Sequence, residues 1–305
     1  MPTPFEARDM TQIHPTAYVD PQAELGRDVE VGAFSYVGPG VQLGDGCRLG
    51  PRVTLLGPSV FGPRNVFYPG CVLGAAPQDL KYKGGPTRLE VGSDNTFREG
   101  VTIHRGTEVD RQSGGVTRIG SRNLFMVGVH VAHDADIADH VIVANAVHMA
   151  GHVRIEDAAV ISGGVLMHHF VTVGRYAYVG GATRVVHDVP PYMKVLGYDQ
   201  EVRAVNTEGL RRWRLPEESI QRLKQAGRLL FMRRSARSPL RTLEALRAIE
   251  ADGLARDEHV RYLVQFLRRK LEFGVHGRVR EHFRCDTDAD RAAFYQRRNS
   301  EKTAP

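Results

Sequence analysis

A repeat of six residues runs through most of the chain and limits the folds open to it. Every sixth residue is large and apolar from Ile13 to Leu73, and again from Ile119 to Val185. The periods of an α-helix and of a half-buried strand, about 3.6 and about 2 residues, do not produce this pattern. Short strands joined by turns and stacked on one another do produce it. The sequence therefore predicts an all-β parallel β-helix with coils of about 18 residues, each built from three strands.

The repeat is interrupted twice. The period is lost around residues 75–90, returns at Val91, Phe97 and Ile103, and is broken again by a polar stretch at about 104–116. A parallel solenoid tolerates such insertions as loops on its outside. The two interruptions are therefore expected to leave the β-helix as longer connections.

The repeat ends at Asp188, and apolar residues with helical spacing follow after Pro216. We assign residues 11–188 to a β-helix domain and 189–275 to a C-terminal α-helical domain. Residues 276–305 are read as a polar, Arg-rich tail.

Composition indicates a globular protein, with 42% hydrophobic and 25% charged residues. There is no apolar run of the roughly 18 residues that a membrane helix needs. The first residues show no secretory signal, and three cysteines cannot form a disulfide framework. These features lead us to expect a cytoplasmic protein without stable membrane insertion.

Positive charge is concentrated in the C-terminal third. Residues 189–305 carry 25 Lys and Arg against 16 Asp and Glu, or +9, whereas the preceding residues carry 16 against 19, or −3. A basic surface of this kind suits either solvation or an acidic protein partner. We expect docking of an acidic protein here, with Arg228, Arg233 and Arg234 taking part, and no nucleic acid.

Stacking at about 18 residues per coil brings six histidines onto adjacent coils. They are His130, His133, His148, His152, His168 and His169. Three readings compete: hydrogen-bonded structural histidines, a metal site, and a general base. Zinc-dependent hydratases of the carbonic anhydrase type share this kind of solenoid, which keeps the metal reading open. Under the general-base hypothesis, we expect Asp134 to fix the imidazole of His133 and the N–H of Gly151 to face an oxyanion. This arrangement suits acyl transfer.

Separate blocks outside the repeat carry a specific resemblance. They include Gln78-Asp79-Leu80-Lys81-Tyr82, Val101-Thr102-Ile103-His104-Arg105-Gly106-Thr107, Ala132-His133-Asp134, Ala150-Gly151-His152, Asp188-Val189-Pro190-Pro191-Tyr192 and Asn206-Thr207-Glu208-Gly209-Leu210-Arg211-Arg212. From about residue 11 to about 275 the chain resembles the UDP-N-acetylglucosamine O-acyltransferase family, which opens lipid A biosynthesis. The resemblance implies a left-handed β-helix and a homotrimer with sites between subunits.

The resemblance also implies the reaction. A 3-hydroxyacyl chain passes from the phosphopantetheine of acyl carrier protein to the 3-hydroxyl of UDP-N-acetylglucosamine, with no metal and no further cofactor. His133 matches the general base, Asp134 its support, and Gly151 the oxyanion donor.

Other matched positions are implied to bind substrate. Gln78, His130, His152, Asn206, Glu208 and Arg212 match substrate-binding positions, as does His169, where the family usually has Gln. Asp79, Lys81 and His104 match residues expected to reach the site from a neighbouring subunit. Gly181 matches the position that limits acyl length. A glycine there implies a long acyl chain, about 12–14 carbons by family analogy. The free energy lost with each methylene that is not buried would set the selectivity between donors of different length.

Some positions depart from the family pattern, namely His148, His169, Tyr198-Asp199-Gln200 and Trp213. Two alternative functions remain beside the resemblance: a metal-dependent hydratase of the carbonic anhydrase type, and an N-acyltransferase acting on a 3-amino sugar nucleotide.

Overall fold

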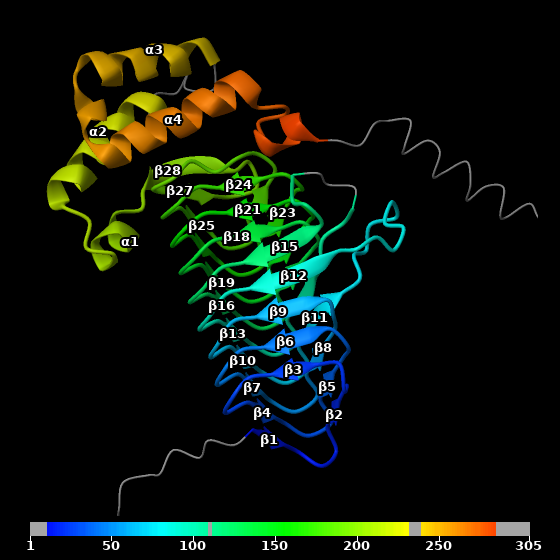
Figure 1. The fold of residues 1–305 in the computed structure, drawn as a ribbon. Coiled ribbons are helices and arrows are strands. Elements are labelled where there is room, and N and C mark those ends of the chain that lie inside the picture. The colour runs from blue at the N-terminus through cyan, green and yellow to red at the C-terminus, as the bar shows by residue number, and fades with distance from the viewer. Residues whose placement is uncertain (1–10, 109–111, 232–238, 285–305) are drawn as a thin grey trace, which may run out of the picture. The chain divides into compact units, whose positions relative to one another are not determined.

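The computed structural model describes residues 11–108, 112–231 and 239–284. Figure 1 shows the short stacked strands of the chain and the helices that follow them in sequence. The chain divides into two compact units, one extending to Ala135 and the other beginning at Asp136. This division falls inside the repeat, so the domain boundary expected at 188/189 stays a prediction.

The first unit consists of three stacks of short parallel strands. One stack contains β1 (Gln12–Ile13), β4 (Glu30–Val31), β7 (Arg48–Leu49), β10 (Val66–Phe67), β13 (Thr96–Phe97) and β16 (Leu124–Phe125). The second contains β2 (Tyr18–Val19), β5 (Tyr36–Val37), β8 (Thr54–Leu55), β11 (Val72–Ala75), β14 (Thr102–His104) and β17 (His130–Val131). The third contains β3 (Glu24–Leu25), β6 (Val41–Leu43), β9 (Ser59–Phe61), β12 (Arg88–Val91) and β15 (Val116–Ile119). The predicted parallel β-helix is confirmed.

The register separates regular coils from interrupted ones. Gln12 pairs with Glu30, which is the spacing that the repeat predicts for one regular coil. Val66 pairs with the more distant Thr96, because the connection 76–87 is inserted between β11 and β12. Thr102 likewise pairs with the more distant His130, because the connection 105–115 is inserted between β14 and β15. Both sequence interruptions are therefore long connections that leave the stacking intact.

The core of this unit is a column of the large repeat residues. Phe97 is fully buried, and its ring stacks between those of Phe67 and Phe125 at centroid distances of 5.1 and 5.2 Å. Beside this column, the buried Asn95 donates a side-chain N–H to the amide oxygen of Asn65 at 2.9 Å. One apolar side chain per hexapeptide thus fills the interior, while polar ladders satisfy the corners.

The second unit continues the repeat in its own strands. These are β18 (Asp136–Ile137), β19 (Ile142–Val143), β20 (His148–Met149), β21 (Arg154–Ile155), β22 (Val160–Ile161), β23 (Leu166–Met167), β24 (Thr172–Val173), β25 (Tyr178–Val179), β26 (Arg184–Val185), β27 (Met193–Leu196) and β28 (Glu201–Val205). The parallel pairs keep the spacing of a regular coil from β18 to β26, as in His148 with Leu166. The last pair, β27 with β28, is antiparallel.

Helices follow the last strand. They are α1 (Thr207–Arg212), α2 (Glu217–Phe231), α3 (Pro239–Ala251) and α4 (Glu258–Phe273), with 3₁₀ turns at Leu254–Arg256 and Arg280–Phe283. Buried residues of α2 and α4, such as Leu223 and Leu263, share one hydrophobic core with Met193 and Val205 of the last two strands. Asp257 begins α4 by accepting hydrogen bonds from the main-chain N–H groups of His259 and Val260. In the described part of the chain, no helix combines the length and apolar character needed to span a membrane.

Candidate active site

The centre of the site is an imidazole held by a buried carboxylate. His133 follows β17, and its side chain is 13% exposed. Its Nδ1 lies 2.8 Å from Oδ2 of Asp134. A carboxylate can only accept this hydrogen bond, so Nδ1 carries the proton and Nε2 keeps its lone pair.

Asp134 is held by further donors. Oδ1 accepts from the main-chain N–H of Thr107 at 2.9 Å and from the hydroxyl of Ser113 at 2.7 Å. Oδ2 also accepts from the hydroxyl of Thr107 at 2.7 Å. With His133, four donors surround a carboxylate whose side chain is fully buried. The orientation of the imidazole is therefore fixed by the hydrogen bond from its Nδ1 to this carboxylate.

The local fold explains this arrangement. Asp134 stands at a corner of the β-helix with φ +59°, a left-handed conformation that Asp tolerates better than most residues. Its own main-chain N–H donates to the hydroxyl of Thr117 in β15 at 2.8 Å. Thr107 and Ser113 come from the inserted connection 105–115. No role was predicted for Thr107, Ser113 or Thr117, although the break in the repeat at about 104–116 marked the segment that contains Thr107 and Ser113.

The other inserted connection brings a carboxylate near Nε2. Oδ2 of Asp79 lies 3.9 Å from Nε2 of His133, too far for a hydrogen bond. The main-chain N–H of Lys81 donates to Oδ1 of Asp79 at 2.9 Å, and its ammonium lies 3.6 Å from Oδ2. Asp79 and His133 are thus neighbours in one chain. The expectation that Asp79 reaches His133 from a neighbouring subunit is wrong, because the connection 76–87 folds back beside its own coil.

Two more predicted histidines lie in the same unit. The rings of His104 and His130 meet edge to face at a centroid distance of 5.3 Å. Nδ1 of His104 donates to the carbonyl of Ala76 at 2.6 Å, and burial lowers the pKa of His104, which the nearby His133 also lowers. His104 therefore belongs to its own chain's site as well. Gln78, the other predicted substrate-binding residue of the connection 76–87 besides Asp79 and Lys81, is exposed.

The remaining predicted residues belong to the second unit. Gly151 is buried, and its carbonyl accepts from the N–H of Phe170 at 3.2 Å. The ring of His152 stacks on Phe170 at 4.3 Å. His168 and His169 have ring centroids 3.9 Å apart, and burial together with His168 lowers the pKa of His169 to about 4. His169 is therefore a neutral hydrogen-bonding group at neutral pH.

Asn206 has a structural role in addition to any contact with substrate. It is buried at the N-terminus of α1, where its side chain accepts from the N–H of Gly209 and donates to the carbonyl of Tyr176. Glu208 and Arg212, on the same helix, are exposed. The neighbouring Trp213 meets the ring of His140 edge to face at 5.0 Å.

The position of Gly181 agrees with the stacking argument. It is exposed at a corner, and a Cβ built on it would meet only the carbonyl oxygen of Gly163, at 3.4 Å. That carbonyl belongs to the glycine one coil earlier, which itself stacks on Asn145. The backbone of Gly181 is not left-handed, so a side chain is tolerated there.

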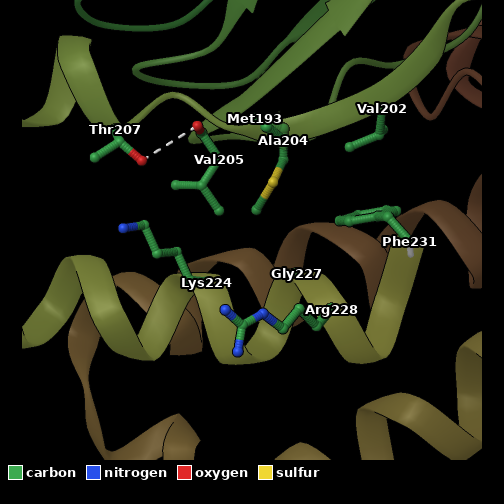
Figure 2. Close-up of a pocket in the computed structure, with 9 residues that line it drawn as sticks. All are labelled: Met193, Val202, Ala204, Val205, Thr207, Lys224, Gly227, Arg228 and Phe231. Atoms are coloured by element: carbon green, nitrogen blue, oxygen red, sulfur yellow. Dashed lines mark hydrogen bonds between the residues drawn. The ribbon is translucent and has the colours of Figure 1, made fainter. Parts of the chain in front are cut away.

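A shallow groove of about 140 Å³ lies between β28 and α2 (Figure 2). The apolar Met193 and Val205 line its strand side, and the apolar Phe231 and the basic Lys224 and Arg228 line its helix side. Arg228 is exposed, as a docking residue must be. Arg233 and Arg234, expected to act with it, lie outside the described residues.

Comparison with known proteins agrees with the β-helix fold and with the resemblance to the acyltransferase family. Residues 188–275 match the family model described as "Udp N-acetylglucosamine O-acyltransferase; Domain 2", and residues 22–57 match "Bacterial transferase hexapeptide (six repeats)". The acyl-[acyl-carrier-protein]–UDP-N-acetylglucosamine O-acyltransferase of Anaeromyxobacter sp. (strain Fw109-5) is 46% identical over 256 residues, which cover 84% of this chain and 96% of the relative. That of Halorhodospira halophila is 42% identical over 258 residues, which cover 85% and 96%.

Solved structures give the same result. The UDP-N-acetylglucosamine acyltransferase of Bacteroides fragilis 9343 is 39% identical, with a TM-score of 0.78 over 84% of this chain and 97% of that one. The homologous structure from Acinetobacter baumannii is 36% identical, with a TM-score of 0.79 over 89% and 100%. The fold is thus the left-handed parallel β-helix with a C-terminal helical region. The chain belongs to the UDP-N-acetylglucosamine O-acyltransferase family.

Proposed function

We propose that His133 is the general base with which this acyltransferase moves a 3-hydroxyacyl chain from acyl carrier protein to the 3-hydroxyl of UDP-N-acetylglucosamine, the first step of lipid A biosynthesis. The observation that carries this role is the pairing of Nδ1 with the buried Asp134 carboxylate, which holds the proton on Nδ1 and so puts the basic lone pair on Nε2. A base held in one tautomer needs no reorganisation before it accepts a proton.

The proton and the bonds then balance in two steps. Nε2 of His133 takes the proton of the sugar hydroxyl while the sugar oxygen bonds to the thioester carbon. The tetrahedral oxyanion accepts an N–H from Gly151, the proposed oxyanion donor. The C–S bond breaks next, and the leaving phosphopantetheine sulfur accepts from Nε2 the proton that came from the sugar hydroxyl. Asp134 stabilises the imidazolium between the two steps.

Substrate contacts are proposed for several polar groups in each of the two units. Asp79, Lys81, His104 and His130 lie with His133 in the first unit and suit hydroxyl and phosphate groups. Proposed contacts from the second unit are His152, His169, Asn206, Glu208 and Arg212. Gln78 is proposed as a further contact from the inserted connection.

We propose that no metal and no bound cofactor take part. The carboxylate oxygens of Asp134 already accept four hydrogen bonds from protein groups, and thioesters react with an activated hydroxyl without a Lewis acid. Exhaustive dialysis against a chelator should leave turnover unchanged. Loss of turnover that zinc restores would favour a hydratase-like metal site instead.

The groove beside α2 is proposed to dock acyl carrier protein. Lys224 and Arg228 supply positive charge next to apolar side chains, a combination that suits an acidic helical partner. A cytoplasmic location fits this partner and is proposed with it.

We also propose a homotrimer, as the resemblance implies. Because Asp79 and His133 are neighbours in one chain, mixed trimers of His133→Ala and Asp79→Ala chains should recover no activity. Recovery in trimers shown to mix would mean that the two residues act across subunits.

The test of the base is the His133→Ala variant in an acyl-transfer assay with 3-hydroxyacyl carrier protein and UDP-N-acetylglucosamine. We expect turnover to fall by about 10²–10⁴ while the fold persists, since the side chain lies outside the core. His14→Ala is the control and should keep full turnover, because His14 is exposed in a regular coil and its side chain bonds to the neighbouring Thr16. Near-normal turnover of His133→Ala would refute the assignment.

A further inference from the structure

A cavity of about 400 Å³ lies within the second unit, and the proposed acyl transfer does not use it. It is lined by the segment before β27, by β27 and β28 with their connection, by residues of α2, α3 and α4, and by the segment after α4. Its apolar lining consists of Pro190, Val195, Val202, Leu230, Phe231, Leu267 and Leu271, and its polar lining includes His187, Asp188, Gln200, Thr242 and Lys270. Pockets for small ligands usually enclose about 300–1,000 Å³ and combine apolar walls with few polar groups in this way.

Lys270, in the last turn of α4, is the basic residue of this lining. Its Nζ donates to the main-chain oxygen of Asp188 at 3.0 Å. An ammonium has three N–H bonds, and over residues 11–108, 112–231 and 239–284 no second acceptor and no carboxylate partner is found for it. Burial lowers the pKa of Lys270, although the charge of Asp188 opposes this effect. An ammonium in such surroundings gains most from an anion.

The carboxylate of Asp188 does not serve as that anion. Oδ1 accepts from the N–H of Thr172 at 2.7 Å and Oδ2 from the N–H of Val279 at 2.8 Å. These bonds hold the carboxylate on the wall, where burial raises the pKa of Asp188 to about 6. Its negative charge would repel a dianion such as a phosphate monoester more than a monoanion.

The neighbouring polar groups are also committed to the wall. The side-chain oxygen of Gln200 accepts from the N–H groups of Val186 and His187, and its amide N–H donates to the carbonyl of His187. Nδ1 of His187 donates to the carbonyl of His276 at 2.8 Å. These bonds hold the side chains of Gln200 and His187 against main-chain groups of the wall. The cationic hydrogen-bond donor that the cavity offers to a ligand is therefore Lys270.

We propose that this cavity binds an amphiphilic carboxylate, a molecule with one anionic head and an aliphatic tail. The head accepts charge-assisted hydrogen bonds from Nζ of Lys270, and the tail lies against Leu230, Leu267 and Leu271. Apolar walls favour the tail, and the single cation selects a monoanion over a neutral head.

Calorimetric titration of the whole 305-residue chain with decanoate tests this site. Lys270→Gln removes the charge and keeps an N–H for the Asp188 carbonyl, so it should weaken decanoate binding roughly 10- to 100-fold. Arg269→Gln, the exposed neighbour on the same helix, is the matched control and should bind as the wild type does. Decanol should bind the wild type as weakly as decanoate binds Lys270→Gln, and acetate should not bind detectably.

A second variant keeps the test decisive. Leu271→Phe fills part of the cavity without touching the charge and should weaken decanoate and decanol alike. Acyl transfer by Lys270→Gln should proceed at the wild-type rate, which separates this site from the proposed active site. Undiminished decanoate binding by both Lys270→Gln and Leu271→Phe would overturn the proposal, and so would equal wild-type affinity for decanol and decanoate.

Discussion

The regular coils of the first unit and its interrupted coils use buried serine hydroxyls for different purposes. In a regular coil the buried Ser35 donates to the carbonyl of Gly50 at 2.9 Å and accepts from the N–H of Val53 at 3.1 Å. In an interrupted coil the buried Ser113 donates instead to the Asp134 carboxylate at 2.7 Å. One serine joins coil to coil, and the other holds the support of the base. Regular repeats build the scaffold, and the breaks in the repeat bring polar groups to one point.

The largest effect should come from the carboxylate behind the base. Asp134→Asn replaces two acceptor oxygens with one acceptor and one donor, which then faces the donors of Thr107 and His133. Since the imidazole loses its tautomer, we expect kcat to fall by roughly 100-fold or more. Asp45→Asn, an exposed carboxylate paired with Arg27 in a regular coil, should leave kcat unchanged. A comparable loss in both variants would erase the distinction between the two regions.

A regular coil of the second unit should govern acyl length rather than rate. Gly181→Met adds a side chain that meets only the Gly163 carbonyl, so the backbone should tolerate it. Each buried methylene contributes about 0.8 kcal/mol, so blocking two of them should shift selectivity about tenfold towards donors of about 10 carbons. The check is kcat/KM across carrier proteins of graded chain length. An unchanged order of preference in a folded variant would remove Gly181 from this role.

A smaller effect should come from the helical region, outside both kinds of coil. Arg228→Glu reverses an exposed charge beside the apolar groove and should raise KM for the acyl carrier protein roughly three- to tenfold. KM for the sugar nucleotide should stay constant, and added salt should narrow the difference. Arg261→Glu, an exposed charge on α4, is the control. Equal changes for both substrates would indicate a solvated surface rather than a dock.

The sequence predicted the scaffold well because a period of six leaves few alternatives. The core residues from Val31 to Phe125 lie where the repeat puts them, and helices α2, α3 and α4 lie where the apolar spacing indicated. His133 and Asp134 were found because they are adjacent in sequence. Thr107 and Ser113 were missed and Asp79 was assigned to the wrong subunit, because inserted connections carry no period and their path depends on tertiary hydrogen bonds. The spacing of a regular coil also fails at the insertions, where each strand pairs with one that lies farther along the chain than the repeat predicts.

The central claim is that the inserted connection 105–115 raises kcat by holding Asp134, which in turn positions His133. A double-mutant cycle between Ser113 and His133 tests this claim most directly. Ser113→Ala removes one hydrogen bond to the buried Asp134 carboxylate and should lower kcat about 10-fold in the wild-type background. In the His133→Ala background the same change should have almost no effect, because a positioning residue has no base left to position. Ser35→Ala should lower stability by about 1 kcal/mol without changing kcat in either background. An undiminished 10-fold loss from Ser113→Ala in the absence of His133 would contradict the account.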